Sequence, residues 1–183
     1  MAKDKELFIV VTQTGTFVSR VIKFVTKAPY NHVSLSLDEN LDKMYSFARK
    51  RPPHVFPSGF MQETMSNSLF GMIDTIPCQI YQVRVSEKQY ETVGKMIDAF
   101  DEIANEYKFN VLGFVSMFFR FRLRRAKRFM CSQFVAYVLS NSHIITFDKD
   151  YSLVTPEDIR KNEKMIMIFD GDLKEYVSGK AIA

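Results

Sequence analysis

A cysteine begins an amphipathic stretch in the last third of the sequence, running from Cys131 to Leu139. Its apolar residues fall at helical spacing: Phe134, Val135, Val138 and Leu139. The spacing predicts a helix that packs one face on a core and carries Cys131 in its first turn. Unpaired backbone amides and the helix dipole stabilise a thiolate at that position. Because a thiolate is a nucleophile at neutral pH, Cys131 is a candidate catalytic residue.

A histidine, His32, opens an alternating run far upstream of the cysteine. Val33, Leu35 and Leu37 alternate with serines, which predicts a half-buried strand. A strand can aim an imidazole at a sulfur carried by a helix, and this pair of groups is what a cysteine hydrolase needs first. The alternative interpretation is structural, since free cysteines are often buried and a lone histidine on a strand is often a core residue.

Three segments resemble the NlpC/P60 superfamily of papain-like cysteine hydrolases. Residues 131–135 read Cys-Ser-Gln-Phe-Val and resemble the start of that superfamily's nucleophile helix; residues 32–37 resemble its His-Val-Gly-Ile-x-Leu strand. The usual order places the cysteine first, and the reversed order here is typical of the circularly permuted branch. That branch includes YiiX/YebB-like proteins and the lecithin:retinol acyltransferase group. Residues 14–22 are similar to the segment that leads into the histidine strand of YiiX-like proteins.

The resemblance implies an α+β, circularly permuted papain-like fold, with an antiparallel sheet packed against the nucleophile helix, in a single domain over residues 1–183. It implies Cys131 as nucleophile and His32 as base and acid, acting on a small amide, a peptide or an acyl lipid. The activity would be that of an amidase, a peptidase or a thioester-forming acyltransferase. The alternative is a weak or inactive binding module of the same fold, holding an acyl-lipid or peptide ligand.

The third catalytic residue is left open by this comparison. The family position, often Glu, His or Asn, falls near Ser46, and a serine supports an imidazolium less than a carboxylate does. The alternatives are Glu63, in a stretch from 51 to 74 that we interpret as a long loop, or an impaired site. Tyr30 is a candidate oxyanion donor, with packing as its alternative role. Ser34 replaces the family's glycine and is expected to crowd the cleft.

Composition sets broad limits on function. Two cysteines in 183 residues do not form a disulfide framework, and we expect Cys78 to be an apolar filler within a strand. The charged N-terminus and the absence of a long apolar segment predict a cytoplasmic protein. The three histidines and two cysteines lack the paired spacings of metal ligands, so we expect neither a metal nor a cofactor.

The segment from Phe118 to Arg128 interleaves phenylalanines with arginines. It is either an exposed arm whose rings pack inward, a peripheral membrane contact or a nucleic-acid contact. The acyl and lipid-like substrates of the permuted family favour lipid over nucleic acid.

The remaining pattern predicts the elements that position these residues. We expect strands over residues 7–12, 33–37, 44–49, 76–85 and 165–169, and helices over 17–27 and 87–107. Ser86 and Gln89 form a capping box, and Thr155 before Pro156 caps a turn. Residues 110–129 are ambiguous, because 119–124 alternate like a strand.

Overall fold

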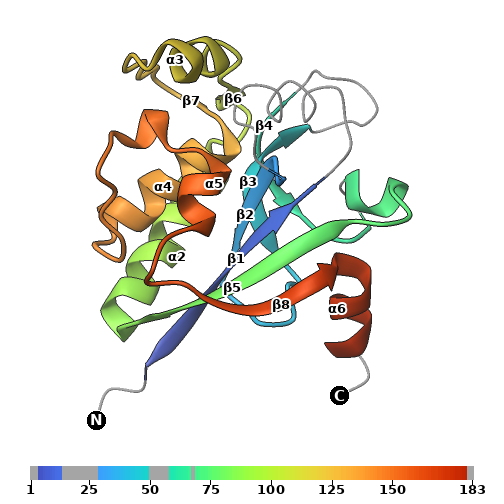
Figure 1. Ribbon diagram of the computed structural model, residues 1–183. Coiled ribbons are helices and arrows are strands. Elements are labelled where there is room, and N and C mark those ends of the chain that lie inside the picture. Colours follow the sequence, from blue (N-terminus) through green and yellow to red (C-terminus); the bar gives the residue numbers. More distant parts are fainter. Residues whose placement is uncertain (1–3, 14–28, 50–57, 67–68, 181–183) are drawn as a thin grey trace.

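The structure is a computed structural model that describes residues 4–13, 29–49, 58–66 and 69–180. Its centre is a six-stranded antiparallel sheet in the order β4-β3-β2-β1-β5-β8 (Figure 1). The strands are β1 (Lys5–Thr12), β2 (His32–Ser36), β3 (Met44–Arg49), β4 (Ser58–Glu63), β5 (Pro77–Val85) and β8 (Ile166–Asp172). The fold is therefore α+β.

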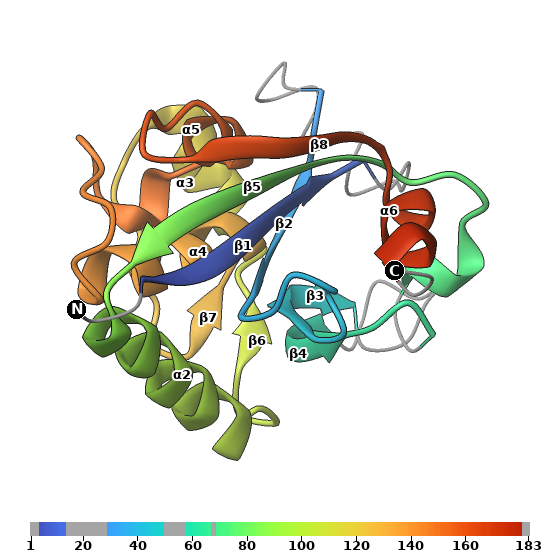
Figure 2. The ribbon, with the colours of Figure 1, turned by 90° about the horizontal axis from the view of Figure 1, so that it is seen from below.

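Helices cover both faces of this sheet. They are α2 (Glu87–Glu102), α3 (Gly113–Phe119), α4 (Cys131–Asn141), α5 (Pro156–Arg160) and α6 (Leu173–Lys180), with 3₁₀ turns η1 (Leu69–Met72) and η2 (Tyr151–Leu153). Two short parallel strands, β6 (Lys108–Phe109) and β7 (Arg128–Phe129), flank α3. Figure 2 shows α2 and α4 on one side of the sheet and α6 on the other. None of the described helices is long and apolar enough to cross a membrane.

Strand alternation divides the apolar residues between two cores. On β1, Leu7, Ile9 and Val11 face the core built with α2 and α4, while Phe8 and Val10 face the core built with α6 and η1. Successive strand side chains point to opposite faces, so one buried strand supplies both layers. The central strands are apolar on both faces because both faces are covered.

Several local predictions are confirmed. The Ser86 hydroxyl accepts from the Gln89 N–H, the Gln89 side chain accepts from the Ser86 N–H, and α2 begins at Glu87. Thr155 caps α5 with Pro156 in its first turn. The five expected strands are present with shifts of a few residues at their ends.

Other predictions are wrong. The stretch from 51 to 74 is not simply a loop, because β4 lies within it and pairs along the whole of β3 with Phe60 buried. The second helix ends at Glu102, not at residue 107. The ambiguous segment is assigned by the structure: residues 113–119 form α3, Arg120 after it is in the left-handed region with φ 56°, and residues 121–124 form no strand. Helix α6 was not expected. The predicted helix over 17–27 and the motif over 14–22 lie outside the described residues.

Candidate active site

Cys131 is the first residue of α4, and its position is fixed by the side chains on either side of it. The Gln133 amide oxygen accepts from the Met130 N–H at 3.0 Å, and its NH₂ group donates to the Ser152 carbonyl at 2.8 Å. Ser132 donates its hydroxyl to the Val154 carbonyl at 2.7 Å. These bonds tie the first turn of α4 to η2 and to the residue that follows it. The first amides of a helix have no acceptor within it, so this turn presents N–H groups beside the sulfur.

His32 is the first residue of β2 and lies opposite Thr12 of β1. Helix α4 packs on β2 and β3, which brings its first residue to the end of β2 where His32 lies. Cys131 lies close enough to the imidazole that its interaction with the ring raises the pKa of His32. The chain therefore brings together the two residues that the sequence singled out, although they are far apart in it.

Glu63 completes the arrangement from β4, two strands away from β2 in the sheet. Its Oε2 and Oε1 lie 3.0 and 3.2 Å from His32 Nε2. The site thus groups a thiol, an imidazole and a carboxylate.

Two serines hold this carboxylate in place. Ser46 donates its hydroxyl to Glu63 Oε2 at 2.6 Å, and Ser34 donates to the same oxygen at 2.7 Å. Ser34 Oγ also lies 3.2 Å from His32 Nε2. Ser46 thus contacts the carboxylate rather than the imidazole, so Glu63 occupies the orienting position and Ser46 supports it. Ser34, expected only to crowd the cleft, belongs to the same network.

Burial makes the charges of this pair depend on each other. The side chains of His32 and Glu63 are 13% and 3% exposed. Burial alone lowers the pKa of His32, but the Glu63 carboxylate and the interaction with Cys131 outweigh burial and raise the pKa to about 10. Burial likewise raises the pKa of Glu63, whereas His32 and the two serine hydroxyls bring it below its usual value. At neutral pH the site holds an imidazolium and a carboxylate.

The structure also places two other residues that the sequence singled out, Tyr30 and Cys78. Tyr30 packs partly buried against the core that contains Cys131, and burial and the charge of Asp170 raise the pKa of its hydroxyl. Cys78 is fully buried in β5 on the α6 side, where burial and the nearby aspartates raise the pKa of its thiol to about 12. Cys78 is therefore an apolar filler. Within the described part of the chain, no three His, Cys, Asp or Glu residues are grouped so that they could hold a metal ion.

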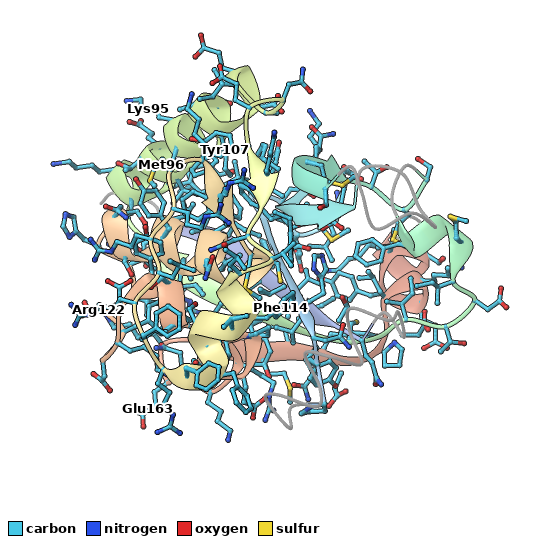
Figure 3. All side chains as sticks on the ribbon, turned by 90° about the horizontal axis from the view of Figure 1, so that it is seen from above. Lys95, Met96, Tyr107, Phe114, Arg122 and Glu163 are labelled. Carbon is cyan, nitrogen blue, oxygen red and sulfur yellow. The ribbon has the colours of Figure 1, made fainter. Side chains whose placement is uncertain are left out.

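A cavity of about 460 Å³ lies apart from this site. Its walls include Met96 and Tyr107, labelled in Figure 3, with Phe129, Tyr137 and the Arg124–Lys127 segment. Neither Cys131, His32 nor Glu63 lines it. The link between the cavity and the site is Phe129, which lines the cavity and precedes Cys131 by two residues in the sequence.

Sequence reasoning missed the residues that hold the first turn of α4. Asn110 donates its amide to Gln133 Oε1 at 3.3 Å, and both side chains are buried. Gln133 follows the cysteine by two residues, but it lies on the face of the predicted helix opposite the apolar residues, so the periodicity did not indicate that it is buried. Its partners could not be read from the sequence, because they come from segments about 20 residues away on either side.

Comparison with known proteins gives no further guide. The chain matches no protein-family model, and it matches none of the curated proteins.

Proposed function

We propose that this protein is a cysteine hydrolase or acyltransferase that acts on an amide or ester, with the circularly permuted papain-like fold. The observation that carries the proposal is that one buried imidazole, His32, pairs with the Glu63 carboxylate and also interacts with the Cys131 thiol. A nucleophile, a base in contact with it and a third group orienting the base form the arrangement that activates a thiol.

The chemistry follows from these three groups. The Cys131 sulfur, as a thiolate, attacks the carbonyl carbon and forms a C–S bond, while N–H groups at the start of α4 stabilise the oxyanion. His32 gives its proton to the leaving amine or alcohol, and the C–N or C–O bond breaks. His32 then takes a proton from water or a second acceptor, which attacks the thioester and releases the sulfur. Glu63 keeps the ring oriented and stabilises its positive charge throughout.

The alternative of a binding module that does not turn its ligand over has one observation in its favour. Cys131 is only 3% exposed. A thiol so enclosed has access to a carbonyl only through a narrow opening, and a ligand could be held above it without reaction.

An acyl-enzyme experiment distinguishes the two functions. The protein is mixed with p-nitrophenyl acetate and p-nitrophenyl octanoate, and the burst of p-nitrophenol and the intact mass are followed together. The proposal predicts a burst close to one equivalent and an acyl adduct on Cys131, both retained in Cys78→Ala and lost in Cys131→Ala. Equal turnover by wild type and Cys131→Ala would rule out the thiol mechanism.

A further inference from the structure

Helix α3 exposes several large apolar side chains to solvent, which a helix that only stabilises the fold would bury. Its buried residues are small, Gly113 and Ser116. Of the ten large apolar side chains exposed in the described part of the chain, six belong to this helix and its flanks: Val111, Leu112, Val115, Phe118, Phe119 and Phe121. Phe118 and Phe119 are 60% and 68% exposed. Exposed apolar residues gathered in this way indicate an interaction surface.

The same region is strongly and uniformly basic. Between Tyr107 and Phe147 the sequence has seven lysines and arginines and no aspartate or glutamate. Arg124 and Lys127 pair with acidic residues from outside this stretch, Asp150 and Glu106. Arg120 and Arg122 form no ion pair with any described residue. We refer to residues 111–128 as the α3 surface, an apolar helix followed by a basic segment.

The α3 surface lies at one end of the molecule. Figure 1 shows α3 at the top of the molecule, next to β6 and β7, the strand that leads into α4. Figure 3 looks onto this end and shows Phe114 on α3 with Arg122 to one side of it. A Cβ on Gly113 would lie 2.6 Å from Met130 Sδ, so the helix is seated directly against the residue before Cys131. The surface and the candidate nucleophile therefore share one end of the protein.

We propose that the α3 surface docks on an anionic lipid bilayer. Aromatic and aliphatic side chains enter the boundary between headgroups and acyl chains, and nearby arginines attract anionic headgroups. Exposed aliphatic side chains such as Leu112 and Val115 gain from acyl burial but add nothing to the stacking of nucleic-acid bases. A second copy of the chain would bring an equally basic surface against this one, and like charges would repel.

Membrane docking also indicates a class of substrate, a point that rests on the proposed function. Because α3 packs against Met130, Cys131 lies at the membrane-facing end. An acyl ester or amide of a membrane lipid fits this placement better than a soluble peptide does.

Sedimentation with sucrose-loaded vesicles tests the docking. The full chain is mixed with vesicles of phosphatidylcholine alone or of equal parts phosphatidylcholine and phosphatidylglycerol. We expect binding to the anionic vesicles that weakens as salt rises from about 0.05 to 0.5 M. Phe118→Ser with Phe119→Ser should lower the partition coefficient at least tenfold. Arg120→Gln with Arg122→Gln should lower it by roughly 10- to 30-fold.

Matched variants test whether vesicle binding needs the α3 surface or only exposed apolar and basic side chains anywhere on the protein. Met72→Ser removes an apolar side chain that is 63% exposed on η1, and Arg84→Gln removes an exposed arginine on β5; both should bind as wild type does. Cys131→Ala should also bind fully, so loss of catalysis and loss of docking are measured independently. Melting temperatures equal to wild type show that the variants are folded.

Three results would overturn the proposal. One is equal vesicle binding by wild type and both double variants. Another is tight binding of a labelled oligonucleotide with no pelleting on anionic vesicles. The third is a dimer in light scattering that the double phenylalanine variant converts to a monomer, with no vesicle binding by either.

Discussion

Glu63 Oε2 on β4 lies 3.0 Å from His32 Nε2 on β2, with strand β3 between the two strands in the sheet, and both side chains are largely buried. A buried ion pair stabilises the fold little more than apolar residues of the same size would. Removing one partner, however, leaves the other as an unpaired charge in an apolar environment. The pair is better explained by what it does to the imidazole, which it keeps charged and oriented beside Cys131. The predictions below test that role.

Replacing the Glu63 carboxylate by an amide should lower activity strongly while the protein stays folded. In Glu63→Gln the shape is kept, but the carboxylate that raises the pKa of His32 is gone while burial still lowers it, so the imidazolium is no longer stabilised. We expect kcat/KM for ester hydrolysis to fall on the order of 10²- to 10⁴-fold. Glu63→Ala should also lower the free energy of unfolding by about 3–5 kcal/mol, measured in urea. Glu163→Gln, at an exposed glutamate labelled in Figure 3, is the control and should change neither.

Ser46 should matter much less than Glu63. It donates to the carboxylate and not to the imidazole, so Ser46→Ala removes one of several hydrogen bonds to Glu63. We expect kcat/KM to fall by about tenfold at most, because Glu63 keeps its contacts with Ser34 and His32. A loss as large as that of Glu63→Gln would show that the serine, not the carboxylate, orients His32.

The pair also predicts how stability depends on pH. The pKa of His32 is raised from 6.5 to about 10 in the folded protein, so its contribution is complete below about pH 6.5 and is lost as pH rises through 10. The pKa of Glu63 is lowered, so its contribution is present above its ordinary value of 4.5 and is lost as pH falls below it. The two together stabilise most between about pH 4.5 and 6.5.

Urea denaturation at several pH values checks this. The difference in free energy of unfolding between wild type and His32→Gln should shrink steadily from pH 6.5 toward pH 10. Comparison with the variant cancels the titration of tyrosines and of Cys78. Parallel curves for the two proteins over that range would be inconsistent with a charged, paired His32.

Gln133 should act as a positioning residue for Cys131. Gln133→Met keeps the volume but leaves the Met130 N–H, the Ser152 carbonyl and the Asn110 amide without this partner. Each buried group left unpaired costs about 1–3 kcal/mol. We expect lower stability together with a lower kcat and a nearly unchanged KM. Asn141→Ala, at the exposed end of the same helix, should leave kcat unchanged.

Local signals in the sequence were sufficient for many elements. The Ser86–Gln89 capping box set the start of α2. The continuous apolar run over 7–12 and the alternation over 33–37 identified the strands that carry the core. These features depend on near neighbours, so the sequence contains them directly. The alternation over 119–124 misled because it describes a surface segment in which no face is buried.

The third group of the site depends on distant pairing, which the sequence does not display. Glu63 reaches His32 because β4 pairs with β3 so that Glu63 lies opposite Met44, and a one-residue slip would turn it to the other face. The prolines and glycines around β4 concealed the strand itself. Glu63 could therefore be named as a candidate but could not be distinguished from Ser46.

The central claim is that His32 holds Cys131 as a reactive thiolate, and cysteine alkylation tests it most directly. The rate of modification of each cysteine by iodoacetamide is measured by peptide mass spectrometry from about pH 5 to 9, in wild type, His32→Ala and Glu63→Gln. Iodoacetamide is small enough for an enclosed thiol, and fully buried Cys78 is the internal control. The account predicts that Cys131 of the wild type is modified much faster than Cys78. In both variants the modification of Cys131 should slow markedly. Equal rates for the two cysteines, or a Cys131 profile unchanged without His32, would contradict it.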